Sequence, residues 1–300
     1  GELDARATAA EAGRLLDLKA EEVLVLSTGV IGARLPLDKL LPGLRQAVAR
    51  LGPEGGTDAA RAIMTTDTRA KEAAASGGGF AVGGMAKGSG MIHPDLATML
   101  AVITTDYPLQ PGEAIDFLRP AVVESFNSIS VDGECSTNDA VILLANGASG
   151  LERTPASDLA FAASLRAVCA DLARQIVADG EGATILAEIS VTGAADHDQA
   201  RAIARRIATS PLVKTALFGR DANWGRVLAA AGSAPWNGGY AELDPDRVTL
   251  AFNGQTVIRA GRPLGAQPDP PQDLCRIELD LGLGHGSASY LTSDFSYDYV

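Results

Sequence analysis

The sequence predicts a mixed fold of the α/β or α+β class. Segments with apolar residues at helical spacing alternate with short apolar runs along much of the chain, and strands with a hairpin signal follow near its end. The chain has 300 residues, of which 46% are hydrophobic. It is therefore long enough to bury a large core in one or two domains.

The first hundred residues are expected to supply helices and a pair of strands. Apolar spacing predicts helices over 9–18, 38–51 and 59–63, a short strand over 22–26, and a strand pair within 71–82. The apolar run 99–103 is bounded by turn residues and suits a strand that is buried on both faces.

The remaining elements are predicted mainly from their end signals. Pro111 suits the first turn of a helix over 111–126, which Pro120 is expected to kink or divide. Thr154-Pro155 is a typical helix start, and Gly180 a typical stop. Further expected elements are a buried strand over 140–145, a strand ending at 191, a helix over 196–209, a helix through 231 capped by Asp221 and Asn223, a hairpin of 248–252 and 256–258 joined at Asn253-Gly254, and strands over 276–281 and 287–292.

Charge and composition exclude several classes of function. The net charge of −12 argues against nucleic acid or an anionic membrane surface as a partner, because both would repel the chain. No apolar run reaches the roughly 18 residues of a membrane span, so we expect a cytoplasmic protein. The three cysteines and three histidines lie at spacings that fit neither a disulfide framework nor a metal site. We therefore expect no metal, and Cys135 is given no role.

The junction Ala97-Thr98 is the first candidate for chemistry. It follows a Gly-rich segment and begins the apolar run 99–103. If the bond between Ala97 and Thr98 were cut, Thr98 would carry a free α-amine beside its own hydroxyl. An α-amine has a pKa of about 7.7 to 8.0, which suits a general base. The alternative is an ordinary, uncut strand start, which composition and periodicity alone favour.

The sequence motifs around this junction, and others in the chain, resemble those of a known family. Ala97-Thr98-Met99-Leu100 is similar to the processing site of the ornithine acetyltransferases, or glutamate N-acetyltransferases, of arginine biosynthesis. This resemblance implies self-cleavage between Ala97 and Thr98, with Thr98 as the nucleophile. The word 27–32, Ser-Thr-Gly-Val-Ile-Gly, resembles the oxyanion hole of the family, which implies that role for Thr28 and Gly29. Without the resemblance, this word is a turn that could cradle an anion.

The same resemblance implies a set of substrate-binding residues. Met-Thr-Thr-Asp-Thr at 64–68 implies Thr66, with Thr65 as the second choice, although such a cluster is usually a capped turn. Lys87 and Glu181 are implied to bind the substrate, along with Thr98. A solvated lysine and a solvated turn are the ordinary alternatives. Asp221 and Asn223 are further residues to consider near the substrate.

For the fold and assembly, the resemblance implies a layered α/β/β/α sandwich that cleaves itself into two intertwined chains. The expected pieces are 1–97, truncated at its start relative to the family, and 98–300, which begins with the nucleophile and lacks a short substrate-binding tail. A homo-oligomer of such pairs is expected.

For the activity, the resemblance implies acetyl transfer from N-acetylornithine to glutamate by a ping-pong route through an acetyl-threonine ester. No cofactor is expected. Acetyl-CoA remains open as an additional substrate, because bifunctional and monofunctional members look alike in these motifs.

Two other functions remain as alternatives. An amidase or aminopeptidase with the same nucleophile would use water in place of glutamate. A non-catalytic phosphate- or nucleotide-binding protein would use the Gly-rich loop 83–90. This loop lacks the order of the phosphate-loop motif, because Gly88 and Ser89 follow Lys87.

Overall fold

A computed structural model describes residues 1–93, 99–265, 268–269 and 271–299. The chain divides into two compact units, Gly1–Thr65 and Thr66–Val300. The expected cleavage junction, Ala97-Thr98, lies outside the described residues. The boundary after residue 65 separates two compact units and is not a break in the backbone. The expected pieces 1–97 and 98–300 therefore stay a prediction.

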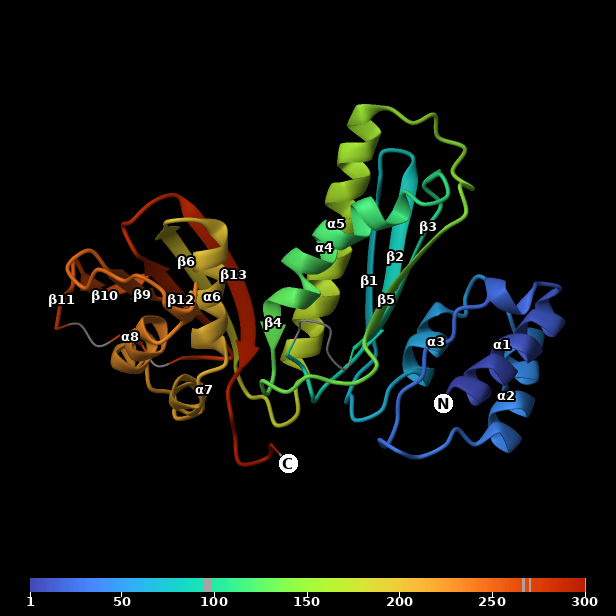
Figure 1. The fold of residues 1–300 in the computed structure, drawn as a ribbon, viewed down its shortest axis with the longest axis horizontal. Helices are drawn as coiled ribbons and strands as arrows, with labels where there is room; N and C mark the ends of the chain where they lie inside the picture. The colour runs from blue at the N-terminus through green and yellow to red at the C-terminus, as the bar shows by residue number, and fades with distance from the viewer. Residues whose placement is uncertain (94–98, 266–267, 270, 300) are drawn as a thin grey trace. The chain divides into compact units, whose positions relative to one another are not determined.

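The first unit is helical. It contains α1 (Glu2–Leu16), a 3-10 turn η1 (Ala20–Glu22), α2 (Leu37–Ala49) and α3 (Gly56–Ala62) (Figure 1). All three predicted helices are present, but the strand predicted over 22–26 is wrong: residues 23–29 have no regular structure. A strand needs a backbone partner, and no described strand pairs with this segment. Leu24 is 64% exposed, so the run is apolar without being packed in a core.

The second unit begins with a four-stranded sheet in the order β1-β2-β3-β5. Its strands are β1 (Lys71–Gly77), β2 (Phe80–Lys87), β3 (Leu100–Thr105) and β5 (Ala140–Ala145). The predicted strand pair is the antiparallel hairpin β1-β2, and β3 lies in the interior of the sheet, parallel to β5. The expectation that 140–145 is buried is wrong. β5 is an edge strand of this sheet, and its residues are half-buried or exposed.

A seven-stranded sheet forms the rest of the second unit, in the order β11-β10-β9-β12-β6-β13-β4. Its strands are β4 (Ile129–Ser130), β6 (Leu186–Ala194), β9 (Thr249–Phe252), β10 (Gln255–Arg259), β11 (Arg262–Pro263), β12 (Leu274–Asp280) and β13 (Gly286–Ser293); β7 (Pro235–Trp236) and β8 (Gly239–Tyr240) form a separate pair. The hairpin at Asn253-Gly254 is confirmed. Both residues have positive φ, 48° and 79°, as the predicted tight turn requires.

Helices complete the layers of the second unit. They are α4 (Ala114–Glu124), the 3-10 turn η2 (Phe126–Ser128), α5 (Pro155–Ala178), α6 (His197–Ala208), α7 (Pro211–Phe218) and α8 (Trp224–Gly232). α7 was not predicted. α4 contains Pro120 but is one helix. As predicted, Thr154 caps α5, and Asn223 caps α8 through its side-chain oxygen.

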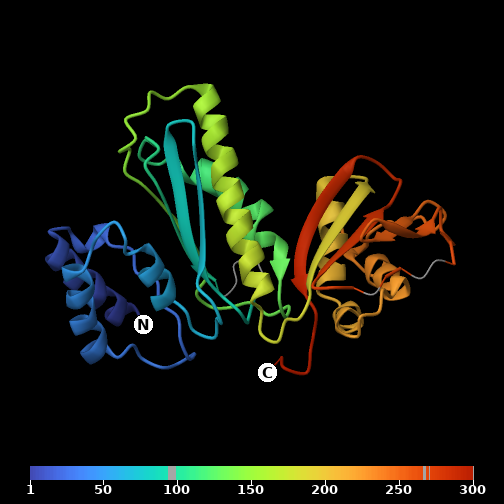
Figure 2. The same ribbon diagram turned by 180° about the vertical axis from the view of Figure 1, so that it is seen from behind.

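The two sheets have separate apolar cores, and α5 packs between them. One core joins the four-stranded sheet to α4 and α5, and the other joins the seven-stranded sheet to α6, α7 and α8. α5 runs along β1 and β2 and also contacts β4 and β13 (Figure 2). The predicted α/β class is confirmed, and a helix rather than a second sheet covers β1 and β2. No helix among the described residues is both long and apolar enough to cross a membrane.

Candidate active site

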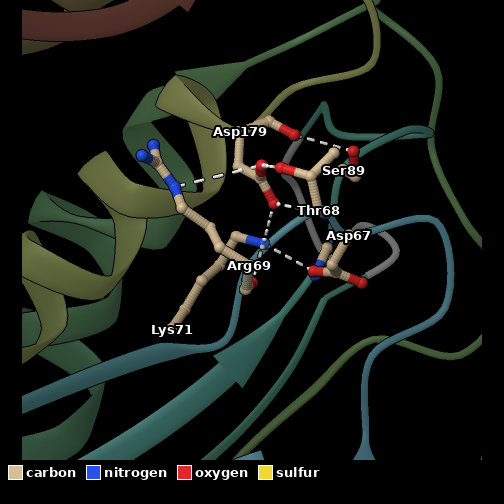
Figure 3. Close-up of polar contacts among 7 residues, drawn as sticks. Asp67, Thr68, Arg69, Lys71, Ser89 and Asp179 are labelled. Carbon is tan, nitrogen blue, oxygen red and sulfur yellow. Dashed lines mark hydrogen bonds and ion pairs between the residues drawn. The ribbon is translucent and has the colours of Figure 1, made fainter. Parts of the chain in front are cut away.

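Three segments meet around a buried lysine in the second unit. They are the turn before β1, the end of β2 and the C-terminal end of α5 (Figure 3). Lys71 is fully buried, and its Nζ lies 2.6 Å from Asp67 Oδ1 and 2.6 Å from Asp179 Oδ2. A buried ammonium is tolerated only when it is paired and hydrogen-bonded, and here two carboxylates provide this.

Further hydrogen bonds extend from these two aspartates. Asp67 Oδ1 accepts the Gly88 backbone N–H at 2.7 Å, and the Ser89 hydroxyl donates to the Asp179 carbonyl at 2.7 Å. Thr68 donates its backbone N–H and its hydroxyl to the Asp179 carboxylate. We call the side chains of Asp67, Thr68, Lys71, Ser89 and Asp179 the Lys71 cluster.

Lys87 is the last residue of β2 and directly precedes Gly88, whose backbone N–H bonds to this cluster. Its side chain is 3% exposed, and β2-β3 pairing places it opposite Leu100. Burial lowers the pKa of Lys87, while the nearby carboxylates of Asp67, Asp139 and Glu181 act against this shift. The ammonium of Lys87 therefore lies in a poorly hydrated environment, where an additional anion would be bound strongly.

Glu181 lies close to the loop that follows β2. Its backbone N–H donates to the Ser89 carbonyl at 2.9 Å. Its carboxylate fills the space beside Gly90, where an added Cβ would lie 2.4 Å from Oε2. Glycine at position 90 thus leaves the room that the Glu181 carboxylate occupies. The charge of Glu181 also acts to raise the pKa of Lys87.

Asp139 is a site residue that the sequence reasoning missed. Its Oδ1 accepts the Met99 backbone N–H at 2.7 Å, and its buried Oδ2 has no hydrogen-bond partner among the described residues. Burial raises the pKa of Asp139 to about 6, against the Met99 hydrogen bond and the charge of Lys87. The sequence signal was the dense polar stretch 130–139, which is typical either of a capped turn network or of a pocket wall and does not single out this carboxylate.

Comparisons with known proteins decide the family. The model of the ArgJ family matches residues 1–300. This chain belongs to the ArgJ family. An "Arginine biosynthesis bifunctional protein ArgJ" from Mycolicibacterium paratuberculosis is 50% identical over 307 residues, which cover 99% of this chain and 74% of that protein. The protein of the same name from Thermobifida fusca is 45% identical, with 99% and 76% covered.

A solved ArgJ structure supports the fold as well. The crystal structure of the arginine biosynthesis bifunctional protein from Bacillus halodurans is 36% identical to this chain. It matches with a TM-score of 0.59 and covers 66% of this chain and 94% of its own. The resemblance seen in the motifs is therefore confirmed at the level of the family.

The remaining predicted residues of this ArgJ-family chain are placed as follows. Thr66 is exposed and directly precedes the buried Asp67, and Thr65 is the last residue of the first unit. Thr28 is half-buried and Gly29 exposed in an irregular segment of the first unit. Ala97 and Thr98 lie outside the described residues. The roles of all these residues stay predictions.

Two other expectations concern cysteine and metal. Cys135 is exposed, and its thiol donates to the His93 carbonyl at 3.1 Å. Across the described ranges, no group of three or more histidine, cysteine, aspartate or glutamate side chains is arranged to hold a metal ion.

Proposed function

We propose that this chain is a glutamate N-acetyltransferase, or ornithine acetyltransferase, of arginine biosynthesis. Membership of the ArgJ family and 45–50% identity to proteins named for arginine biosynthesis support this function. The observation that carries it in the structure is that buried Lys87, opposite Leu100 of β3, lies two residues before Ser89, whose carbonyl accepts the Glu181 N–H at 2.9 Å.

The reaction follows a ping-pong route through Thr98. The Thr98 hydroxyl attacks the acetyl carbonyl of N-acetylornithine while the α-amine of Thr98 accepts the hydroxyl proton. The amide C–N bond then breaks, and the departing ornithine amine takes up that proton. The amine of glutamate next attacks the acetyl ester, releasing N-acetylglutamate and restoring the hydroxyl. Thr28 and Gly29 donate to the oxyanion of both tetrahedral intermediates, where losing one donor typically costs about 2.7–4 kcal/mol.

Lys87 and Glu181 suit charged groups that donor and acceptor both carry. Each has an α-carboxylate and one free amine, which is the side-chain amine in N-acetylornithine and the α-amine in glutamate. The Lys87 ammonium pairs with the carboxylate, the Glu181 carboxylate pairs with a substrate ammonium, and Thr66 adds a hydroxyl. Because Lys87 is buried, its interaction with a substrate carboxylate is strengthened relative to a surface pair.

The maturation and assembly of the protein are part of the proposal. The chain cuts itself between Ala97 and Thr98, and pieces 1–97 and 98–300 stay associated and form a homo-oligomer of such pairs in the cytoplasm. No cofactor is required. Acetyl-CoA is a second acetyl donor to assay, because the named relatives are called bifunctional.

Mass spectrometry and kinetics test this function together. The intact mass should give two fragments, of which the larger begins Thr-Met-Leu-Ala, and N-acetylornithine without glutamate should add one acetyl group to that fragment. Glutamate should then remove the acetyl group as N-acetylglutamate. Loss of the acetyl group to water at the same rate without glutamate would instead indicate an amidase. An intact chain stabilised by nucleotide or phosphate would indicate the non-catalytic alternative.

A further inference from the structure

We propose that the Lys71 cluster is a positioning centre that holds Thr66, Lys87 and Glu181 at fixed distances from one another. The inference rests on the proposed function, because it assigns a task to residues next to the substrate-binding ones. None of the five cluster side chains is itself taken to touch the substrate. They act through the three segments that they join.

Each predicted substrate-binding residue is the close neighbour of a residue held by the cluster. Thr66 precedes Asp67, which accepts from Lys71 at 2.6 Å. Lys87 precedes Gly88, whose backbone N–H donates to the same Asp67 oxygen at 2.7 Å. The three segments are far apart in sequence, and Lys71 joins two of them because its ammonium contacts both Asp67 and Asp179.

Ser89 links Glu181 to the cluster through two groups, its side-chain hydroxyl and its backbone carbonyl. The Ser89 hydroxyl donates to the Asp179 carbonyl at 2.7 Å, and the Ser89 carbonyl accepts the Glu181 N–H at 2.9 Å. These two bonds fix the turn after α5 against the end of β2. The Asp179 carboxylate is meanwhile held by Lys71. A shift of Lys71 would therefore move the Glu181 segment relative to Lys87.

The electrostatic environment explains why a lysine is needed at this position. The carboxylates of Asp67 and Asp179 are both buried, and the ammonium of Lys71 lies between them. The Arg69 guanidinium is more distant from Asp179, at 3.9 Å, and 57% exposed. Without Lys71, two buried carboxylates would repel each other, and the turn and the helix end that carry them would separate.

The test compares Lys71→Met with Lys214→Met. Lys214 is the matched control, because it is also buried and donates to Thr292 Oγ1 at 2.9 Å, in contact with the other sheet. We expect Lys71→Met to raise KM for both N-acetylornithine and glutamate by roughly tenfold or more, with a smaller change in kcat. Lys214→Met should leave both KM values within about twofold of the wild type, whatever its stability.

Hydrogen exchange supplies a readout that does not depend on activity. The backbone amides of Thr68, Gly88 and Glu181 all donate within or beside the cluster. All three should exchange faster in Lys71→Met and should keep their protection in Lys214→Met. A wild-type protein without acetyl transfer would overturn the proposed function, while the exchange pattern would still decide whether the three segments are coupled.

A milder pair of variants covers the case in which Lys71→Met does not fold. Ser89→Ala removes the hydroxyl bond to Asp179, and Ser125→Ala is its control, because Ser125 is also buried and donates to a backbone carbonyl in α4. Ser89→Ala should raise both KM values about threefold or more and speed exchange at Glu181. Unchanged KM values and unchanged exchange in folded Lys71→Met or Ser89→Ala would overturn the inference.

Discussion

The carboxylate of Asp139 holds the backbone N–H of Met99 at 2.7 Å. Met99 is the residue directly after Thr98, and the Met99 carbonyl in turn accepts the Ala140 N–H at 3.1 Å. Asp139 thus fixes the start of β3 against the start of β5. The second oxygen of Asp139 is buried without a hydrogen-bond partner among the described residues, so ionisation of this carboxyl has an electrostatic cost.

This cost predicts how Asp139→Asn changes stability with pH. The pKa of Asp139 is raised from 3.8 to about 6 in the folded protein. The folded state therefore binds the proton more tightly than the unfolded state, and stability falls as the pH rises from about 4 to about 6. Asparagine keeps an oxygen for Met99 and carries no charge. Asp139→Asn should be about 1 kcal/mol more stable than the wild type at about pH 8, after allowing for partial solvent screening.

Urea unfolding at several pH values measures this difference. The gain of Asp139→Asn over the wild type should be small near pH 4 and should grow through about pH 6. A gain that is the same at every pH would mean that the Asp139 charge is not its source.

The charges of Lys87 and Glu181 should contribute to the binding of both the acetyl donor and the acetyl acceptor. Lys87→Met and Glu181→Gln each remove one charge from a site that we propose binds a zwitterion. Each should lower kcat/KM for both N-acetylornithine and glutamate by about 10- to 150-fold, as expected for the loss of a charge-assisted hydrogen bond. Cleavage at residue 98 should remain, as judged by gel electrophoresis. Lys39→Met, at an exposed position in α2, is the control.

The interpretation of these variants depends on both substrates. If Lys87→Met or Glu181→Gln bound both amino acids normally, the assigned roles would be wrong. If a variant changed kcat/KM for only one of the two substrates, N-acetylornithine and glutamate would not share one binding mode.

Gly90 should control the position of Glu181. A Cβ at residue 90 would lie 2.4 Å from Glu181 Oε2, so Gly90→Ala must displace the glutamate. We expect a rise in KM of roughly tenfold for both amino acids, with cleavage retained. Gly43→Ala is the matched control, because a Cβ at Gly43 meets no atom within 4 Å. Equal kinetics for the two variants would show that the carboxylate position at Glu181 is unimportant.

The parts of the fold that the sequence predicted depend on local signals. Thr154 and Asn223 cap their helices with their own side chains, and Asn253-Gly254 adopts the positive φ angles that its dipeptide favours. The run 22–26 has the composition of a strand, but strand formation depends on a partner that composition does not reveal. The position of β6 between β12 and β13 is likewise set by long-range pairing.

Residues of the site were predicted only where they lie in a recognisable sequence motif. Lys87 and Glu181 were found by resemblance, and the Ser89 carbonyl, two residues after Lys87, accepts the Glu181 N–H. Lys71 was missed, because a lysine at a strand start usually reaches solvent. Its burial depends on Asp179, which lies 108 positions away in the sequence. Charge pairing over that separation leaves no periodic pattern in the chain.

The most direct prediction concerns Thr98, which directly precedes Met99 in the sequence, the residue whose N–H is held by Asp139. If Thr98 first attacks the preceding carbonyl and later uses its freed amine as the base, Thr98→Ala should abolish both cleavage and acetyl transfer. Thr98→Ser keeps the hydroxyl and should retain part of each activity, reduced because serine lacks the methyl group that restricts the rotamer.

Intact-mass spectrometry and an acetyl-transfer assay on the same samples decide between the outcomes for Thr98. Thr98→Ala should give one uncut mass and no acetylated fragment, whereas the wild type should give two fragments with acetyl on the larger one. An uncut chain with full transfer activity would contradict the mechanism. A Thr98 inside a peptide bond has no α-amine to accept the hydroxyl proton, so some other base would have to activate the nucleophile.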